Sequence, residues 1–335
     1  MIAHSYPTIA PGDVERVVSA LNKRVLSTGS LVSEFESMLA RYFGKQYVVA
    51  TSSGTAALHV LLAARLRRGD AVLVPGYVCS AVPNAARLAR LIVQYGDVDR
   101  DGNLVDPGVG TQVGDVRAII LTHTFGKEAV VKLPRNGMLV HDCSHRFCPP
   151  STPGDVVVSF NATKPITTGV GGAVLTDNES LYRLLSASVS SEGFDETIRY
   201  PYRMSDVQAA LGIGQLEQVT EFSARRQAIA QYYSAGLDDL PLDLPSFGDS
   251  DFVYRYVVKA QTAAEAIRIL AASHERGIRC ERPIDPPNEC KGLTGVKNAL
   301  DLNVSLPIYP SLSMRDAETV IDTIRSTLRS RRWGS

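Results

Sequence analysis

Short apolar runs alternate with helical stretches between about residues 47 and 176. Helical stretches are expected at 55–68 and 80–90, after the first two runs. The runs are apolar nearly throughout, as in strands whose two faces are both covered by helices. The pattern predicts an α/β fold with a mostly parallel central sheet sandwiched by helices. The runs are YVVAT (47–51), AVLVP (71–75), LIVQY (91–95), AIILT (118–122), GMLVH (137–141) and VVVSF (156–160).

The second half of the chain has a different pattern. Ser205 and Gln208 form a capping box that begins a long amphipathic helix, expected to run to Leu237. A loop rich in proline and aspartate (240–251) then marks a boundary. A strand at 253–260, a helix capped by Thr262 and a last helix after Ser313 follow. We therefore predict a large domain at 1–236 and a small C-terminal α+β domain at 237–335.

Composition excludes several classes of protein. The 335 residues include 35 basic and 35 acidic side chains, so no net field attracts nucleic acid or an anionic membrane surface. No apolar run approaches the length of a membrane span, and the N-terminus has no secretory pattern. The 5 cysteines have no CxxC spacing, which favours reduced thiols over disulfides or a metal site. We expect a cytoplasmic protein that binds no metal, nucleic acid or membrane.

A possible phosphate-binding turn lies at the end of the first predicted strand. Ser53, Gly54 and Thr55 connect this strand to a helix. The free N–H groups and the dipole at a helix N-terminus attract a phosphate, and glycine lets the backbone approach it closely. Taken alone, these residues are explained as simply by an N-cap of the helix.

Two charged residues follow later strands. Asp142 comes directly after the strand at 137–141, where a carboxylate either caps a turn or keeps a pyridine nitrogen protonated. Lys164 lies in SFNATKPITTGVGGAVLT (159–176), between a strand and a glycine-rich turn. It is either a surface lysine or an amine that forms a Schiff base. Phosphate turn, carboxylate and lysine, in that order, are what pyridoxal phosphate (PLP) requires, so together they predict a PLP site.

The sequence also resembles the DegT/DnrJ/StrS family of PLP-dependent sugar aminotransferases. The similarity covers most of the chain, and the segment around Lys164 and YRMSDVQAALG are its most specific parts. It implies a fold-type I PLP-dependent transferase. The matching segments are STGSLVSEFESMLARYFG (27–44), SSGTAALHVLLAA (52–64), GDAVLVPGY (69–77), HTFG (123–126), HDCSH (141–145), 159–176, YPYRMSDVQAALGIGQLE (200–217) and LNVSLPIYPSL (302–312).

The resemblance implies a role for each matching residue. Lys164 corresponds to the lysine that holds the cofactor as an internal aldimine, and Asp142 to the partner of the pyridine nitrogen. His145 stands where the family has glutamine or histidine beside the ring. Tyr202 and Arg203 lie in the block that reaches toward the partner subunit and are candidate substrate residues. The phosphate contacts correspond to Gly54, Thr55 and Ser159.

The chain departs from the family pattern at several positions. Cys79 stands where the family has an aromatic residue that stacks on the ring, although Tyr77 is nearby. Pro201 replaces an asparagine that binds the phosphate of the neighbouring subunit, and a proline has no N–H to replace the amide. Val170 replaces an acidic residue. We therefore expect weaker cofactor binding than in typical relatives, and a substrate pocket that differs from theirs.

The resemblance implies transfer of an amino group from an amino acid, glutamate or glutamine, to a keto group. The acceptor is a nucleotide-linked keto-sugar or a keto-cyclitol, and the enzyme is a homodimer with shared active sites. One alternative is a sugar dehydratase on the same scaffold, against which Lys164 argues because such relatives carry histidine there. Another is a regulatory homologue that binds PLP without turnover.

Overall fold

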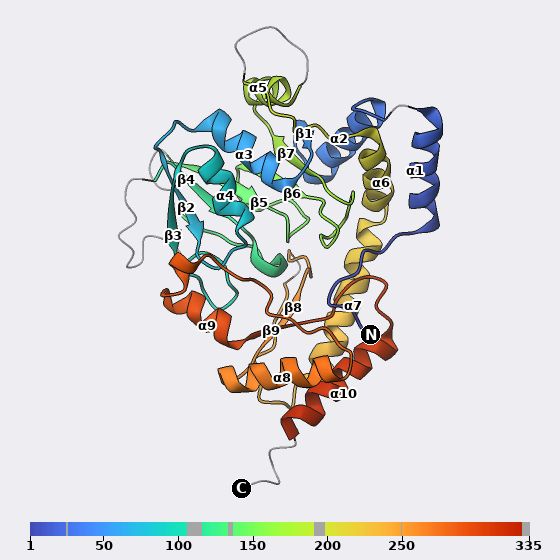
Figure 1. The fold of residues 1–335 in the computed structure, drawn as a ribbon, viewed down its shortest axis with the longest axis vertical. Helices are drawn as coiled ribbons and strands as arrows, with labels where there is room; N and C mark the ends of the chain where they lie inside the picture. Colours follow the sequence, from blue (N-terminus) through green and yellow to red (C-terminus); the bar gives the residue numbers. More distant parts are fainter. Residues whose placement is uncertain (25, 106–115, 133–136, 191–197, 249, 330–335) are drawn as a thin grey trace.

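A seven-stranded sheet forms the centre of the protein (Figure 1). The computed structural model describes the chain except residues 25, 106–115, 133–136, 191–197, 249 and 330–335. The strand order is β1-β7-β6-β5-β4-β2-β3, in which β7 runs antiparallel to both neighbours and the other pairs are parallel. The predicted α/β fold with a mostly parallel sheet is confirmed. The strands are β1 (Tyr47–Thr51), β2 (Ala71–Pro75), β3 (Ile92–Gly96), β4 (Ala118–Leu121), β5 (Met138–Asp142), β6 (Asp155–Ser159) and β7 (Gly172–Thr176).

Helices cover both faces of this sheet. On one face, Val49 and Val157 are buried in a core closed by α3 (Gly54–Arg65), α4 (Ala81–Leu88) and α5 (Glu179–Val189). On the other face, Val48 and Val156 are buried with α2 (Ser30–Phe43) and α6 (Asp206–Glu217). Successive side chains of a strand point to opposite faces. Burial on both faces therefore explains why the strands read as uninterrupted apolar runs, and each large apolar side chain buried there contributes about 1.5–3 kcal/mol.

The long helix expected after Ser205 is divided in two, so that part of the prediction is wrong. The cap itself is present, since Ser205 Oγ accepts from Gln208 N at 3.3 Å. α6 ends at Glu217, and α7 (Val219–Leu237) begins after Gln218. The Gln218 side-chain amide donates to Gly214 O at 2.9 Å, in place of the backbone N–H that a continuous helix would use. The same amide donates to Asp13 Oδ1 at 3.0 Å, on α1 (Pro11–Lys23).

The C-terminal part has its own two-stranded antiparallel sheet, formed by β8 (Tyr256–Lys259) and β9 (Asn303–Leu306). Strand β8 is shorter than the predicted 253–260, because Tyr254 N donates to Phe125 O instead of pairing with β9. The core around this sheet includes Tyr233 of α7, which precedes residue 237. The division at 236/237 stays a prediction. The remaining elements are α8 (Ala263–Glu275), α9 (Thr294–Leu302), α10 (Met314–Arg329) and the 3₁₀ turns η1 (Thr124–Gly126) and η2 (Asn288–Cys290).

The N-terminal segment lies against this C-terminal part (Figure 1). Ile2 forms a parallel bridge with Ile278, and His4 Nε2 lies 2.8 Å from Ser305 Oγ of β9. Because α1 packs against α6, the first residues link the C-terminal part to the helices that cover the large sheet. Over the described ranges, no helix has the length and apolar character needed to cross a bilayer.

Candidate functional site

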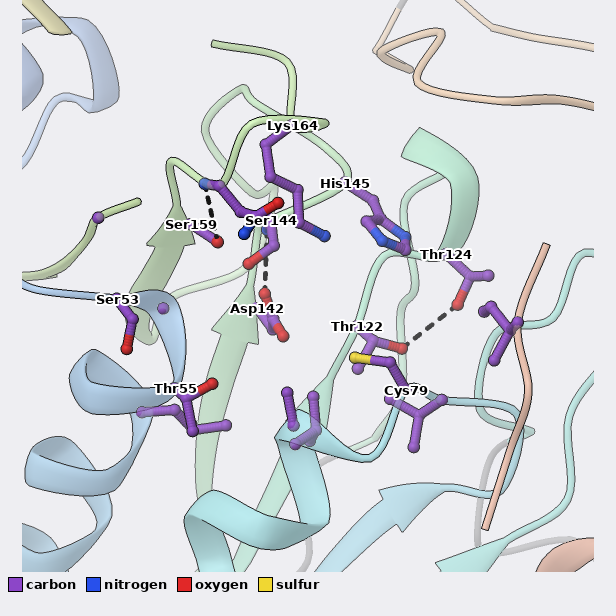
Figure 2. Close-up of a pocket in the computed structure, with 18 of the residues that line it drawn as sticks. Ser53, Thr55, Cys79, Thr122, Thr124, Asp142, Ser144, His145, Ser159 and Lys164 are labelled. Carbon is purple, nitrogen blue, oxygen red and sulfur yellow. Dashed lines mark hydrogen bonds between the residues drawn. The ribbon is translucent and has the colours of Figure 1, made fainter. Parts of the chain in front are cut away.

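A cavity of about 230 Å³ lies at the carboxyl ends of the parallel strands (Figure 2). This is the edge at which open α/β sheets bind ligands. Lys164 reaches down from its loop toward the strand end that carries Asp142, with the His145 ring beside it (Figure 2). The cavity brings together all seven predicted cofactor-binding residues, which are Gly54, Thr55, Cys79, Asp142, His145, Ser159 and Lys164.

The N-terminus of α3 forms one wall of the cavity. Ser53 Oγ accepts from Ala56 N at 3.0 Å, so the simple N-cap interpretation is correct for its side chain. Gly54 follows, and a Cβ on it would lie 2.7 Å from the Ser159 Cβ. Only glycine allows the start of α3 to approach the end of β6 so closely. The N-cap and the cavity wall are thus the same structure, and the N-terminus of α3 is available to an anion.

Asp142 is the last residue of β5 and lies at the base of the cavity. Its Oδ1 accepts from Ser144 N at 3.0 Å, so the carboxylate also caps the turn that follows. Burial raises the pKa of Asp142, while the hydrogen bonds from Ser144 and the charge of Lys164 oppose this rise. A cationic N–H group placed in the cavity would stabilise this buried carboxylate.

Lys164 projects from the loop between β6 and β7 and is half-buried. The loop is closed locally by the Lys164 N–H, which donates to Asn161 O at 2.9 Å, and by Thr168 N, which donates to Phe160 O at 3.0 Å. The ammonium lies 5.5 Å from the centre of the Tyr254 ring. The structure therefore favours the interpretation of Lys164 as a cavity lysine over that of an exposed turn residue.

Two aromatic rings lie near His145. Its ring stacks on Tyr254 with 4.4 Å between centroids, and the nearly parallel Phe125 ring lies 6.5 Å away. Burial, with the charges of Lys164 and Arg255, lowers the pKa of His145 well below its usual range, so the ring is neutral at physiological pH. Its buried Nδ1 has no hydrogen-bond partner within the described part of the chain. An unsatisfied polar atom of this kind is costly, and it is available to a ligand.

Part of the cavity lining is apolar. Cys79 is exposed and lines the cavity together with Val78, Val82 and Ile284. Tyr77 also lines the cavity but is itself 1% exposed. The Asn303 side chain donates to its hydroxyl at 3.4 Å, so Tyr77 is held by the C-terminal part. Val170 lines the cavity as well, from the glycine-rich turn.

The two candidate substrate residues lie elsewhere. The described residues that line the cavity do not include Tyr202 or Arg203. The Tyr202 ring stacks on Tyr200, 5.3 Å away, and its hydroxyl lies 3.2 Å from His59 Nδ1. Arg203 bridges to Thr51 at the end of β1. Both residues therefore lie outside the cavity of their own chain, and their role in substrate binding stays a prediction.

Several residues that line the cavity were not predicted from the sequence. Thr122 and Thr124 follow β4, and their hydroxyls lie 3.3 Å apart at the cavity (Figure 2). The rule that singled out Asp142, a polar residue at the end of a strand, applies to them equally. Ile284 had no such signal, because it reaches the cavity from the C-terminal part.

The family model for the DegT/DnrJ/EryC1/StrS aminotransferase family matches residues 7–325. The chain belongs to this family. The predicted relationship is therefore confirmed, the chain is an aminotransferase, and the cofactor of the family is PLP.

Individual relatives are similar over nearly the whole chain. The UDP-4-amino-4,6-dideoxy-N-acetyl-beta-L-altrosamine transaminase of Campylobacter jejuni is 26% identical, over 100% of this chain and 99% of its own. The GDP-perosamine synthase of Escherichia coli O157:H7 is 29% identical, over 95% and 96%. The solved structure of Helicobacter pylori PseC, an aminotransferase, has a TM-score of 0.87 at 20% identity, over 98% and 99%. This last similarity concerns the fold.

The residues present fit PLP. The start of α3 with Ser159 would hold the phosphate, Asp142 the ring nitrogen, and Lys164 the aldehyde carbon. The free Nδ1 of His145 would face a polar substituent of the ring. Bound PLP would supply an electron sink for the electron pair left when a Cα–H bond breaks. Among the side chains that the structure places, His, Cys, Asp and Glu form no cluster of 3 or more suited to a metal ion.

Proposed function

We propose that this aminotransferase moves an amino group from an amino acid, glutamate or glutamine, to a keto group of a nucleotide-linked sugar. A related keto-cyclitol is a second acceptor class. The observation that carries the proposal is the position of Lys164 in the same cavity as Asp142 and the N-terminus of α3. The acceptor class is supported by the curated relatives, which are named for UDP- and GDP-linked amino sugars.

Three residues of this chain would perform the chemistry. The Lys164 amine would act as a base that takes the proton from the Cα of the amino donor, and then as an acid that delivers this proton to the cofactor carbon bearing the transferred nitrogen. The Asp142 carboxylate keeps a proton on the ring nitrogen during both transfers. His145 is neutral and stacked on Tyr254, and it would lie against the cofactor ring without adding a charge.

We further propose that two copies of the chain share their active sites. Tyr202 and Arg203 lie away from the cavity of their own chain, which supports a role for both at the site of a partner subunit. A homodimer with two-fold symmetry would place the same block of each copy against the other. The expected compartment is the cytoplasm, in keeping with the free cysteines of the chain.

A spectrum of the PLP-loaded protein tests the reaction type. Added glutamate or glutamine should convert its absorption to that of pyridoxamine phosphate, with release of the oxo acid. A panel of nucleotide keto-sugars and keto-cyclitols then identifies the acceptor that restores the starting spectrum. A regulatory homologue would leave the spectrum unchanged with every donor. A dehydratase would consume a sugar without taking up nitrogen, which mass spectrometry of the product detects.

A further inference from the structure

Tyr254 contacts two residues of the candidate site without lining the cavity. Its ring stacks on His145, with 4.4 Å between centroids and 23° between planes. The same ring lies 5.5 Å from Lys164 Nζ. Tyr254 precedes β8 in the C-terminal part and is 3% exposed. The buried Tyr254 ring, which belongs to the C-terminal part, thus contacts both His145 and Lys164 of the candidate site.

Contacts of both the main chain and the side chain fix the position of Tyr254. The Tyr254 backbone N donates to Phe125 O at 3.3 Å, and the Tyr254 carbonyl accepts from Arg226 Nη1 at 3.1 Å. The Arg255 guanidinium lies 4.8 Å from the ring centre and also donates to the hydroxyl at 3.3 Å. Arg255 in turn donates to His4 Nδ1 at 3.1 Å, on the N-terminal segment. Tyr254 is therefore held more firmly than an ordinary loop residue.

The hydroxyl of Tyr254 lies in a cationic environment. Burial alone would raise its pKa, but the charges of Lys164, Arg255 and Arg226, with a hydrogen bond from Thr163, lower the pKa from 10.0 to about 8. The two histidines nearby, His145 and His4, add no positive charge to this environment. Burial keeps His145 neutral, and burial with Arg255 lowers the pKa of His4 to about 3. Glu281 lies beyond His4, 3.1 Å from its Nδ1.

We propose that Tyr254 is a positioning residue of this enzyme. It fixes the plane of His145, and it holds the Lys164 amine beside the cavity whenever that amine is not bonded to the cofactor. The inference rests on the proposed role of Lys164. An amine that leaves and rejoins the cofactor in each cycle reacts faster when it is held near the reacting carbon. The ammonium form of Lys164, 5.5 Å from the centre of the Tyr254 ring, is attracted to that ring.

Ionisation of tyrosine in the cofactor-free protein tests the contact directly. Ultraviolet difference titration should show one phenol with a midpoint near pH 8. Tyr254→Phe should remove this transition, whereas Tyr256→Phe, a buried tyrosine of the adjoining strand, should leave it in place. Lys164→Met removes the nearby cation and should move the midpoint upward by about 1 pH unit. A transition that survives Tyr254→Phe, or a midpoint unchanged in Lys164→Met, would overturn the proposal.

The half-reaction with the amino donor tests the consequence. Tyr254→Leu should slow it by about 3- to 30-fold, the range of a buried cation–π contact, while KM for the donor changes less than kcat. Tyr254→Phe keeps the ring and should lose less than about threefold. A folded Tyr254→Leu protein with the wild-type rate would contradict the proposal; if this variant does not fold, the titration decides. Attachment of PLP to a different lysine would instead overturn the proposed function, which peptide mapping distinguishes from loss of the tyrosine contact.

Discussion

At the scale of single residues, Asp142 shows how one side chain serves both structure and chemistry. It ends β5, caps the following turn through Ser144 N, and faces the cavity with its charge. Asp142→Asn keeps the shape and the turn but removes the charge that holds a protonated ring nitrogen. We expect PLP to remain bound while kcat falls about 100-fold or more, as when other preorganised electrostatic contacts are lost.

Measurement of kcat together with a PLP titration separates loss of turnover from loss of PLP binding. Asp177→Asn provides the control, because its carboxylate has 52% side-chain exposure and pairs with Lys45 away from the cavity. That variant should keep the wild-type kcat. Turnover at the wild-type rate in Asp142→Asn would remove Asp142 from the proposed mechanism.

Glu36 gives a prediction about stability and pH. Burial raises its pKa from 4.5 to about 7, against the hydrogen bond that its Oε1 accepts from Ala50 N at 2.7 Å. Between these two values the folded state binds more protons than the unfolded state, so the free energy of unfolding falls as pH rises. Glu36→Gln should therefore stabilise the protein by about 1–3 kcal/mol above pH 7 and change little below pH 4.5.

Urea unfolding across this pH range measures the effect. Glu34→Gln on the same helix is the control, because Glu34 is exposed and its replacement should change the free energy of unfolding by less than about 0.5 kcal/mol. Equal stability of the Glu36→Gln and wild-type proteins at both ends of the range would contradict the burial argument.

Residue-level prediction from sequence succeeded where chemistry and position coincide. Asp142 ends β5, Gly54 begins α3 and Lys164 lies in the loop that follows β6. Their convergence therefore followed from the sheet topology. Tyr254 had no comparable signal. It contacts His145 and Lys164 only because the C-terminal part packs against the turn at Phe125, and that packing depends on residues far apart in the chain.

At the scale of elements, the approach of α3 to β6 shapes the phosphate end of the cavity. Gly54→Ala would place a methyl group 2.7 Å from Ser159 Cβ, and one of the two elements must then shift. We expect a loss of about 1–3 kcal/mol in stability together with weaker PLP binding. Gly12→Ala is the control, since a Cβ at Gly12 meets nothing within 4 Å.

Thermal unfolding and PLP titration of both variants test this prediction. The Gly12→Ala protein should match the wild type in PLP affinity and should be no less stable, because alanine favours the helix more than glycine does. Unchanged PLP affinity in Gly54→Ala would show that the phosphate does not lie at the start of α3.

The bounds of strands were predicted best where burial of apolar side chains alone determines them. Strands β1 and β2 have the predicted bounds, since their apolar runs are covered on both faces. The division between α6 and α7 was missed, because it depends on the side chain of Gln218 replacing a backbone donor. Strand β8 was predicted too long, because part of the segment pairs with the turn at Phe125 instead of with β9.

At the scale of the whole molecule, the proposed homodimer is the main prediction. Light scattering at micromolar concentration should give twice the mass of the chain, because Tyr202 and Arg203 are expected to complete the site of a partner. Mixing an inactive Lys164→Ala protein with an inactive Arg203→Ala protein should restore part of the activity, since one site of the mixed dimer has both residues intact. A fully active monomer would contradict the proposal of shared sites.

Borohydride reduction of the PLP-loaded protein tests whether Lys164 carries the cofactor. Reduction makes the bond between lysine and cofactor permanent, and peptide mapping by mass spectrometry then locates it. We predict the label on the peptide containing Lys164, and none on the Lys164→Ala protein, which should still fold because the side chain is only half-buried at the cavity. A label on another lysine, or an unchanged label in Lys164→Ala, would show that Lys164 does not hold the cofactor.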